Sequence, residues 1–205
     1  MADIKKMMFN DKYGLEQAVL NGTKTMTRRY AEKILAEDID QMFFWTGEFA
    51  KPKYHVDDVV GIAQPYKNLN IGADTMIETV KTVDGKKKKG WYPACQTPGW
   101  NNKMFVQGQL MEHFIKITDV KIERVQDISD EDCMREGIFI DKMRESIGDE
   151  NKYCFDVHGE KNISRWWFPT PKDAFEGLMR KLNGKYFWKE NPYMYVYSFE
   201  LIKPN

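Results

Sequence analysis

The stretch that decides the fold is "KYGLEQAVLNGTKTMTRRY", residues 12 to 30. Leu15 and Val19 lie at helical spacing, and Gly22 follows where a helix of this kind commonly ends. No apolar face continues through residues 23 to 29, so we predict an extended segment or turn that leads away from the helix. This segment holds three threonines and three cations. Packing alone does not explain such a dense polar run, and we expect its side chains to face a cleft.

The charge of the chain is balanced overall and uneven locally. Its 205 residues carry 31 basic and 31 acidic side chains, so it lacks the bulk positive field that strong non-specific binders of duplex nucleic acid use. Residues 81 to 103 carry six lysines against Asp84 alone, whereas residues 126 to 150 carry nine acids against three bases, as a solvated face often does. We predict a soluble globular protein with one domain, residues 1 to 205, in which any nucleic-acid contact is local.

Signals for targeting, disulfides and metals are weak. The N-terminal "MADIKKMMFN" lacks the apolar segment of a signal peptide, and no apolar run approaches the about 20 residues needed to cross a bilayer. We therefore expect a cytoplasmic protein without membrane contact. Cys95, Cys133 and Cys154 show no Cys-x-x-Cys spacing, so we expect reduced thiols. Cys154 with His158 is the one metal-like spacing, and without a second pair of ligands we predict no metal and no cofactor.

The middle of the chain shows less regular patterns. Residues 31 to 45 have apolar side chains at three- to four-residue spacing, which predicts an amphipathic helix. A turn at residues 57–58 precedes a strand through residues 59–63. Residues 67 to 103 fit no regular pattern, and we interpret them as an insertion on the core fold, with a hairpin turn at residues 84–85.

The second half of the chain carries clearer signals. Residues 113 to 128 alternate in polarity and predict one long bent strand or a pair of strands. Residues 129 to 137 predict a short helix, and residues 170 to 184 predict a longer one, each with a capping residue at its start and a glycine at its end. A strand with aromatic residues at alternate positions follows at residues 193 to 202. We expect residues 138 to 168 to be irregular.

The order of these elements indicates the fold class. Strands lie far apart in the sequence, and helix–strand alternation is not repeated, which argues against a doubly wound sheet. We therefore predict an α+β fold, in which a small mixed β-barrel is surrounded by helices and carries insertions.

Four residues of the opening stretch, Gly22, Lys24, Thr27 and Arg29, fill a Gly-x-Lys-x-x-Thr-x-Arg pattern. With the preceding helix "LEQAVLNG", this pattern resembles the entry motif of the ASCH domain, a branch of the PUA-like superfamily. "YHVDDVVGI" is similar to the family's Gly-Asp-Val strand, with Asp57 where glycine is usual. "ITDVKIERVQDISDEDCMREGI" resembles its central strand and acidic helix. "NPYMYVYSFELI" resembles the closing strand of longer members that are often found in phages and prophages. The resemblance implies a PUA-like barrel.

The resemblance also implies an activity. Some small ASCH proteins are amidohydrolases that remove the acetyl group from N4-acetylcytidine with a lysine, a threonine and a glutamate. Matched position by position, those residues are Lys24, Thr27 and Glu136. The implied substrate is a pyrimidine nucleoside or an unpaired base of single-stranded RNA.

The chemistry of these three residues leaves several interpretations open. Thr27 is an effective nucleophile only beside a base, and Lys24 is a base only if burial or a neighbouring cation lowers its pKa from about 10.4. A nearby Glu136 acts in the opposite direction and favours a plain salt bridge, although it also suits recognition of a cytosine amine. The cluster is thus a structural ion-pair network, a binding pocket without turnover, or a site for hydrolysis or nuclease activity.

Other residues are candidates for binding. Gly22, Arg28 and Arg29 are candidate substrate or nucleic-acid contacts, and Arg29 suits a phosphate or ribose oxygen. "GKKKKGW" suits phosphate contacts or the protection of a hairpin edge. Aromatic residues at 193–199 favour core packing, and Trp166–Trp167 in "SRWWFP" are better candidates for stacking on a base. The alternatives to a hydrolase are a non-catalytic RNA- or nucleotide-binding module, such as a phage accessory protein, and a metal-independent ribonuclease.

Overall fold

The computed structural model describes residues 4–31, 52–83, 86–158 and 163–202. It divides the chain into two compact units that are each assembled from separate segments. The first unit comprises Met1–Phe9, Val59–Ile115 and Ile202–Asn205, and the second comprises Asn10–Asp58 and Lys116–Leu201. The insertion predicted at residues 67 to 103 therefore falls entirely within the first unit.

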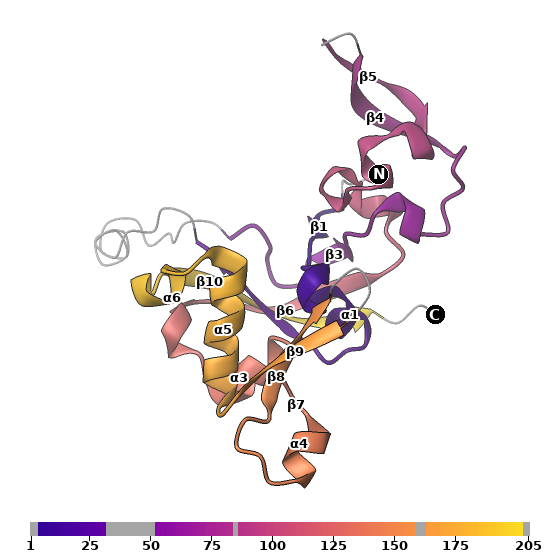
Figure 1. Ribbon diagram of the computed structural model, residues 1–205. Helices are drawn as coiled ribbons and strands as arrows, with labels where there is room; N and C mark the ends of the chain where they lie inside the picture. The colour runs from indigo at the N-terminus through magenta and orange to yellow at the C-terminus, as the bar shows by residue number, and fades with distance from the viewer. Residues whose placement is uncertain (1–3, 32–51, 84–85, 159–162, 203–205) are drawn as a thin grey trace, which may run out of the picture. The chain divides into compact units, whose positions relative to one another are not determined.

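The first unit is built from short strands and single turns of 3-10 helix. Its strands are β1 (Lys6–Met7), β3 (Val59–Ile62), β4 (Met76–Val83) and β5 (Lys86–Pro93). Its 3-10 turns are η2 (Tyr66–Asn68), η3 (Ala94–Gln96), η4 (Pro98–Trp100), η5 (Lys103–Phe105) and η6 (Gly108–Leu110). β1 pairs in parallel with β3, and β4 pairs antiparallel with β5 as a two-stranded ribbon (Figure 1). The predicted strand after residue 58 and the predicted hairpin are confirmed, while the turn at residues 84–85 lies outside the described residues.

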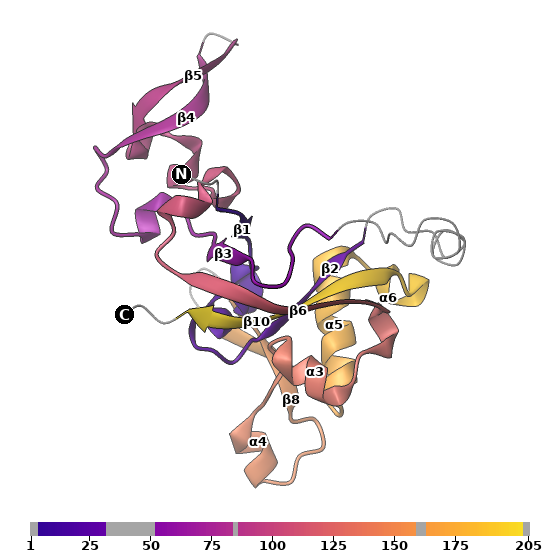
Figure 2. The ribbon, with the colours of Figure 1, turned by 180° about the vertical axis from the view of Figure 1, so that it is seen from behind.

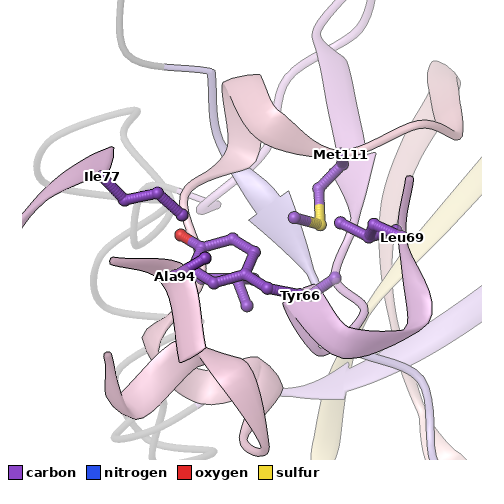
Figure 3. Close-up of a cluster of buried hydrophobic side chains, with 7 residues drawn as sticks. Tyr66, Leu69, Ile77, Ala94 and Met111 are labelled. Carbon is purple, nitrogen blue, oxygen red and sulfur yellow. The ribbon is translucent and has the colours of Figure 1, made fainter. Parts of the chain in front are cut away.

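A tyrosine ring is the centre of the hydrophobic core in the first unit. Tyr66 belongs to a cluster of seven buried hydrophobic residues, whose other members include Leu69, Ile77, Ala94 and Met111 (Figure 3). Its hydroxyl accepts a hydrogen bond from the backbone N–H of Gln107 at 2.9 Å, so the buried phenol has a polar partner. Gly99 is packed so closely that a Cβ at this position would lie 2.5 Å from Cε2 of the ring. The 3-10 turns of this unit therefore surround one buried aromatic side chain.

The second unit combines two sheets with helices. Its helices within the described residues are η1 (Asp11–Tyr13), α1 (Leu15–Leu20), η7 (Val125–Asp127), α3 (Asp130–Arg135), α4 (Lys142–Ser146), α5 (Pro171–Asn183) and α6 (Phe187–Glu190). Its described strands are β2 (Met26–Tyr30), β7 (Phe139–Ile140), β8 (Tyr153–His158), β9 (Ile163–Phe168), and most of β6 (Phe114–Arg124) and of β10 (Tyr193–Ile202). β10 lies between β6 and β2, and α3 packs against α5 (Figure 2). β8 lies between β7 and β9 in the second sheet.

Local capping signals explain where two helices begin. The Ser129 hydroxyl accepts a hydrogen bond from the backbone N–H of Asp132 at 3.1 Å, which caps α3. The Thr170 hydroxyl accepts one from the backbone N–H of Asp173, also at 3.1 Å, and caps α5. Gly184, with a φ of 102°, follows the last residue of α5. Both predicted helices are confirmed.

α5 also shows how an amphipathic pattern becomes packing. Its buried residues Ala174, Phe175, Leu178 and Met179 recur at helical spacing on one face. The Phe175 ring meets Trp188 of α6 edge-on, with 6.1 Å between ring centroids. In the described part of the chain, no helix combines the length and the apolar character that crossing a bilayer requires.

The turn before β3 has the backbone geometry that a glycine usually provides. Asp57 has a φ of 70°, in the left-handed region that few residues other than glycine and asparagine adopt readily. Its backbone N–H donates to the Ile117 carbonyl at 2.9 Å, and its carboxylate lies 2.8 Å from Lys116 Nζ. Asp57 stands where the family resemblance expected glycine, and aspartate is among the residues other than glycine that adopt this conformation most often.

Three expectations from the sequence need correction or qualification. The α+β class is confirmed, but none of the sheets formed by the described strands closes into a barrel, because each has strands that pair on one side only. Residues 138 to 168, expected to be irregular, contain β7, α4, β8 and β9. Buried Cys154 and Phe155 lie in β8, and the β8–β9 hairpin is long enough to pair six residues of each strand. The helix predicted at residues 31 to 45 lies almost wholly outside the described residues.

The packing of Tyr66 predicts a large difference between two substitutions. We expect Tyr66→Ala to lower the free energy of unfolding by about 3–5 kcal/mol, because it removes a buried ring from the centre of the core. Tyr66→Phe keeps the ring and loses only the hydrogen bond from Gln107, at a cost of about 1 kcal/mol. Urea denaturation followed by circular dichroism measures both. Equal losses for the two variants would contradict the central role of the ring.

Candidate functional site

A tight turn between α1 and β2 positions Lys24. Gly22 has a φ of 73°, a conformation that suits glycine at the end of a helix, and its N–H donates to Val19 O at 2.9 Å. The backbone N–H groups of Thr23 and Lys24 then both donate to the carbonyl of Ala18, each at 2.9 Å. The predicted helix end and extended segment are therefore confirmed, and Gly22 contributes through its backbone.

The C-terminal end of α3 positions Glu136. Its backbone N–H donates to the Asp132 carbonyl at 2.9 Å, which completes the last turn of the helix. The preceding residue, Arg135, accepts a hydrogen bond at its carbonyl from the backbone N–H of Thr25 at 2.9 Å. The end of α3 is thus bonded directly to the segment that enters β2.

Lys24 and Arg28 share the carboxylate of Glu136. Lys24 Nζ donates to Glu136 Oε2 and to the Glu136 backbone carbonyl, both at 2.6 Å. Arg28 Nη1 donates to Glu136 Oε1 at 3.0 Å. Lys24 is 2% exposed and Glu136 is 3% exposed, so these charges meet away from solvent. One buried carboxylate therefore serves two buried cations.

Additional carboxylates compensate the charge of Arg28. Its Nη2 donates to Glu123 of β6 and lies 3.4 Å from Asp132 Oδ2 of α3. Burial opposes the charge of Arg28, but Glu136 and Glu123 outweigh burial and raise its pKa. The guanidinium also lies over the Phe175 ring, 5.7 Å from its centroid. Arg28 was expected to contact substrate or nucleic acid. In this structure its guanidinium instead forms ion pairs with carboxylates of the protein.

The pKa of Lys24 reflects two opposing effects. Burial lowers the pKa of its amine below the ordinary value, and Glu136 opposes this by attraction and by its hydrogen bond. The nearby positive charges of Arg29 and Arg28 add to the effect of burial. The net result is a lowered pKa, the direction that a general base requires.

Thr27 and Arg29 lie on the opposite face of β2 from Arg28. In the β2–β10 register Thr27 is opposite Tyr197 and Arg29 is opposite Tyr195, and residues that are directly opposite share a face. The Tyr197 ring meets Tyr54 edge-on at 5.3 Å, and burial raises the pKa of Tyr54 to about 12. Burial also lowers the pKa of Arg29. Thr27 is therefore a buried hydroxyl beside aromatic rings, apart from the contacts that Lys24 makes with Glu136.

A cavity of about 430 Å³ in the second unit lies next to the ion cluster. Its lining residues are Tyr13, Gly14, Gln17, Ala18, Asn21, Thr23, Gly137, Ile138, Phe139, Asp156 and His158. A Cβ added to Gly137 would lie 3.6 Å from Lys24 Cδ, so the stem of Lys24 runs behind this wall of the cavity. The volume is in the range of small-molecule sites. Thr23 and Gly137 line the cavity, whereas their neighbours Lys24 and Glu136 do not.

The structure brings together some of the predicted site residues and adds others. Lys24, Arg28 and Glu136 are in direct contact, while Thr27 and Arg29 lie on the other face of the strand. Residues that were missed in the sequence are Glu123, Asp132, Arg135 and Lys121, which extend the cluster by ion pairs. Asp132 and Arg135 lie three residues apart on a helix, a spacing that signals an ion pair. Nothing local connects Glu123 with the opening motif.

The metal-like spacing in β8 does not form a metal site. Cys154 and His158 lie four residues apart on one strand, which separates them by about 13 Å, too far to share an ion. The Cys154 thiol is buried and donates to the Phe139 carbonyl at 3.5 Å. Burial raises the pKa of the Cys133 and Cys154 thiols to about 12, so both are unreactive at neutral pH.

The two tryptophans expected in a loop lie in strand β9 instead. Trp166 and Trp167 keep 45% and 38% of their surface exposed. Lys181 Nζ lies 4.0 Å from the centroid of Trp166, and the Arg144 guanidinium lies 4.1 Å from that of Trp167. Each ring therefore already carries a cation of the protein on one face.

Comparisons with protein-family models, with curated proteins and with solved structures find no match to this chain. We therefore infer the function of this chain from the geometry of the site. A buried amine with a lowered pKa, held against a carboxylate, can accept and return a proton. The same group of charges can also serve only to join β2, β6 and α3.

The sharing of Glu136 predicts unequal effects of two substitutions. Glu136→Gln leaves Lys24 and Arg28 buried without this carboxylate, and we expect a loss of about 3–5 kcal/mol in the free energy of unfolding. Lys24→Met leaves Glu136 paired with Arg28, so we expect less than half of that loss. Glu131→Gln, on the exposed side of α3, is the matched control and should have almost no effect. Similar losses for Lys24→Met and Glu136→Gln in urea denaturation would contradict the shared carboxylate.

The lowered pKa of Lys24 predicts a specific pH dependence. Between the folded pKa and the unfolded value of about 10.4, the unfolded chain binds more protons, so this residue makes stability rise with pH. We expect the stability of the wild type to increase relative to that of Lys24→Met as pH rises through that window. Tyr54 and the buried thiols have raised pKa values and act in the opposite direction, but equally in both proteins. Parallel curves of unfolding free energy against pH would show that the pKa of Lys24 is not lowered.

Proposed function

We propose that this chain is an ASCH-type protein of the PUA-like superfamily that acts in the cytoplasm on a pyrimidine nucleoside or an unpaired RNA base. The proposed reaction is hydrolysis of an N4-acyl amide, as in N4-acetylcytidine. One observation carries the proposal: Lys24 Nζ lies 2.6 Å from Glu136 Oε2 in a buried site. These residues are 112 positions apart, and the family resemblance names both as catalytic residues. No local feature of the sequence requires that contact.

The proposed chemistry uses the buried amine as a base. Thr27 Oγ1 attacks the acyl carbonyl carbon, and because Thr27 lies on the other face of β2 from the Lys24–Glu136 contact, its proton reaches the neutral amine of Lys24 through a bridging water. The C–N bond then breaks, and the departing N4 amine takes the proton back from the Lys24 ammonium. Water attacks the resulting threonine ester with the amine again as base, which releases the carboxylic acid and restores the hydroxyl. Atoms and protons balance without a cofactor.

Arg28 has a supporting role in this proposal. A carboxylate that belonged to Lys24 alone would favour the charged ammonium and reduce its basicity. Because Arg28 bonds the other oxygen of Glu136, the negative charge is shared, and the positive charge of Arg28 further lowers the pKa of Lys24. Glu136 then keeps the amine in position by hydrogen bonding without holding its proton strongly.

An assay in which chromatography measures the conversion of N4-acetylcytidine to cytidine tests this proposal. We expect turnover by the wild type, with a rate that rises with pH as Lys24 loses its proton. Lys24→Met removes the base and Thr27→Val removes the nucleophile with little change in shape, so both should lower the rate by at least about 100-fold. Thr118→Val, on an exposed hydroxyl of β6, should keep the wild-type rate.

The other outcomes identify the alternatives. Absence of turnover by folded wild-type protein at every pH tested would overturn the hydrolase proposal. Cytidine binding in calorimetry without turnover would leave a non-catalytic nucleoside-binding module. Cleavage of single-stranded RNA that disappears in Lys24→Met and Thr27→Val would identify a ribonuclease.

A further inference from the structure

The β4–β5 ribbon of the first unit has one face that combines exposed apolar side chains with lysines. In its register Val80 is opposite Lys89, and Glu78 is opposite Trp91. Residues that are opposite each other share a face, as do residues two apart on one strand. The full set on this face is Met76, Glu78, Val80, Thr82, Lys87, Lys89, Trp91 and Pro93. We call it the Trp91 face.

The apolar members of this face are unusually exposed. Trp91 has 63% of its surface exposed, and Met76 and Val80 each have 51% exposed. The opposite face holds Ile77, which is 4% exposed and belongs to the core around Tyr66. One side of the ribbon therefore anchors it to the unit, and the other presents a large indole to solvent. A solvent-facing tryptophan among other exposed apolar side chains is typical of an interaction surface.

The charge of the ribbon selects the kind of partner. Its described residues carry five lysines, Lys81, Lys86, Lys87, Lys88 and Lys89, against Glu78 as the acidic residue. Glu78 lies 3.3 Å from Lys89, and both side chains are largely exposed, so this ion pair is weak and screened. A partner complementary to this surface is a polyanion.

The combination of lysines with Trp91 favours a single-stranded nucleic acid over other polyanions. Lysines neutralise the phosphates of a nucleic-acid backbone, and an exposed aromatic ring stacks on an unpaired base. The bases of a duplex are stacked on one another and do not offer a free face to such a ring. Lysines alone have another explanation, because they protect the open edges of a two-stranded ribbon from pairing with other chains. That explanation does not account for Trp91, since an exposed indole promotes such association rather than preventing it.

We propose that the Trp91 face binds a single strand of RNA or DNA, with Trp91 stacked on a base and Lys87 and Lys89 on the flanking phosphates. This site goes beyond the proposed hydrolysis, which involves residues of the second unit. Turnover of free N4-acetylcytidine does not require the ribbon, so each proposal can fail without the other.

Fluorescence anisotropy of the full chain with labelled 12-nucleotide single strands tests the site. We expect Trp91→Ala to weaken binding by about 5- to 150-fold, the range produced by loss of one base–aromatic stack, and Trp91→Phe to restore most of it. Tyr186→Ala, at an aromatic side chain of the second unit that is 65% exposed, should bind like the wild type. RNA and DNA strands of the same sequence, together with the corresponding duplexes, show which nucleic acid is preferred.

The dependence on salt tests the lysines separately. Lys87→Ala/Lys89→Ala should reduce the slope of log affinity against log salt by about 1.4, which corresponds to about 0.7 for each lost phosphate contact on a single strand. Lys185→Ala/Lys189→Ala removes the same charge elsewhere and should leave the slope unchanged.

Several results would overturn the proposal. The wild type could fail to bind at low salt, or Trp91→Ala could keep the wild-type affinity. The two double lysine variants could reduce the salt slope equally, or duplexes could bind more tightly than single strands. Unaltered circular dichroism of each variant establishes that a loss of binding is not a loss of fold.

Discussion

The carboxylate of Glu136 is the group on which the ion cluster of the second unit depends. It lies at the end of α3 and bonds two cations, Lys24 and Arg28, that approach along the segment leading into β2. A buried cation is tolerated only when a counter-charge is within bonding distance. The position of α3 relative to β2 is therefore fixed by charge as well as by packing, and the backbone bond from Thr25 to Arg135 reinforces it.

This arrangement links the stability of the fold to the chemistry of Lys24. The attraction and hydrogen bond of Glu136 stabilise the buried amine of Lys24 and favour its charged form. Burial and the neighbouring arginines favour the neutral form. Arg28 avoids the conflict because Glu123 and Asp132 supply it with further negative charge. Among the described residues, Lys24 has the shared carboxylate of Glu136 as its one acidic partner, and it is consequently the member of the cluster whose protonation is most open to change.

Local signals in the sequence predicted more of this structure than long-range ones did. Ser129 and Thr170 mark helix starts because a cap is a contact between residues three apart, and the long strand through residue 117 follows from its alternation. The role of Glu123 depends on β6 lying beside Arg28, which no local pattern expresses. The β8–β9 hairpin was missed because several of its strand residues are polar or charged. The contact of Lys24 with Glu136 joins residues 112 positions apart, and the family resemblance, not a local pattern, connects the two.

The strand order has a consequence for how the second unit forms during synthesis. β10, at Tyr193–Ile202, is the last strand described in the chain, yet it lies between β6 and β2 in the sheet. While the ribosome is still adding residues 137 to 190, β2 and β6 lack the strand that pairs with both. The charges of Lys24 and Glu136 are both present in the nascent chain by then, but the sheet that shields them is not. Completion of this unit is thus delayed until after β10 has left the exit tunnel.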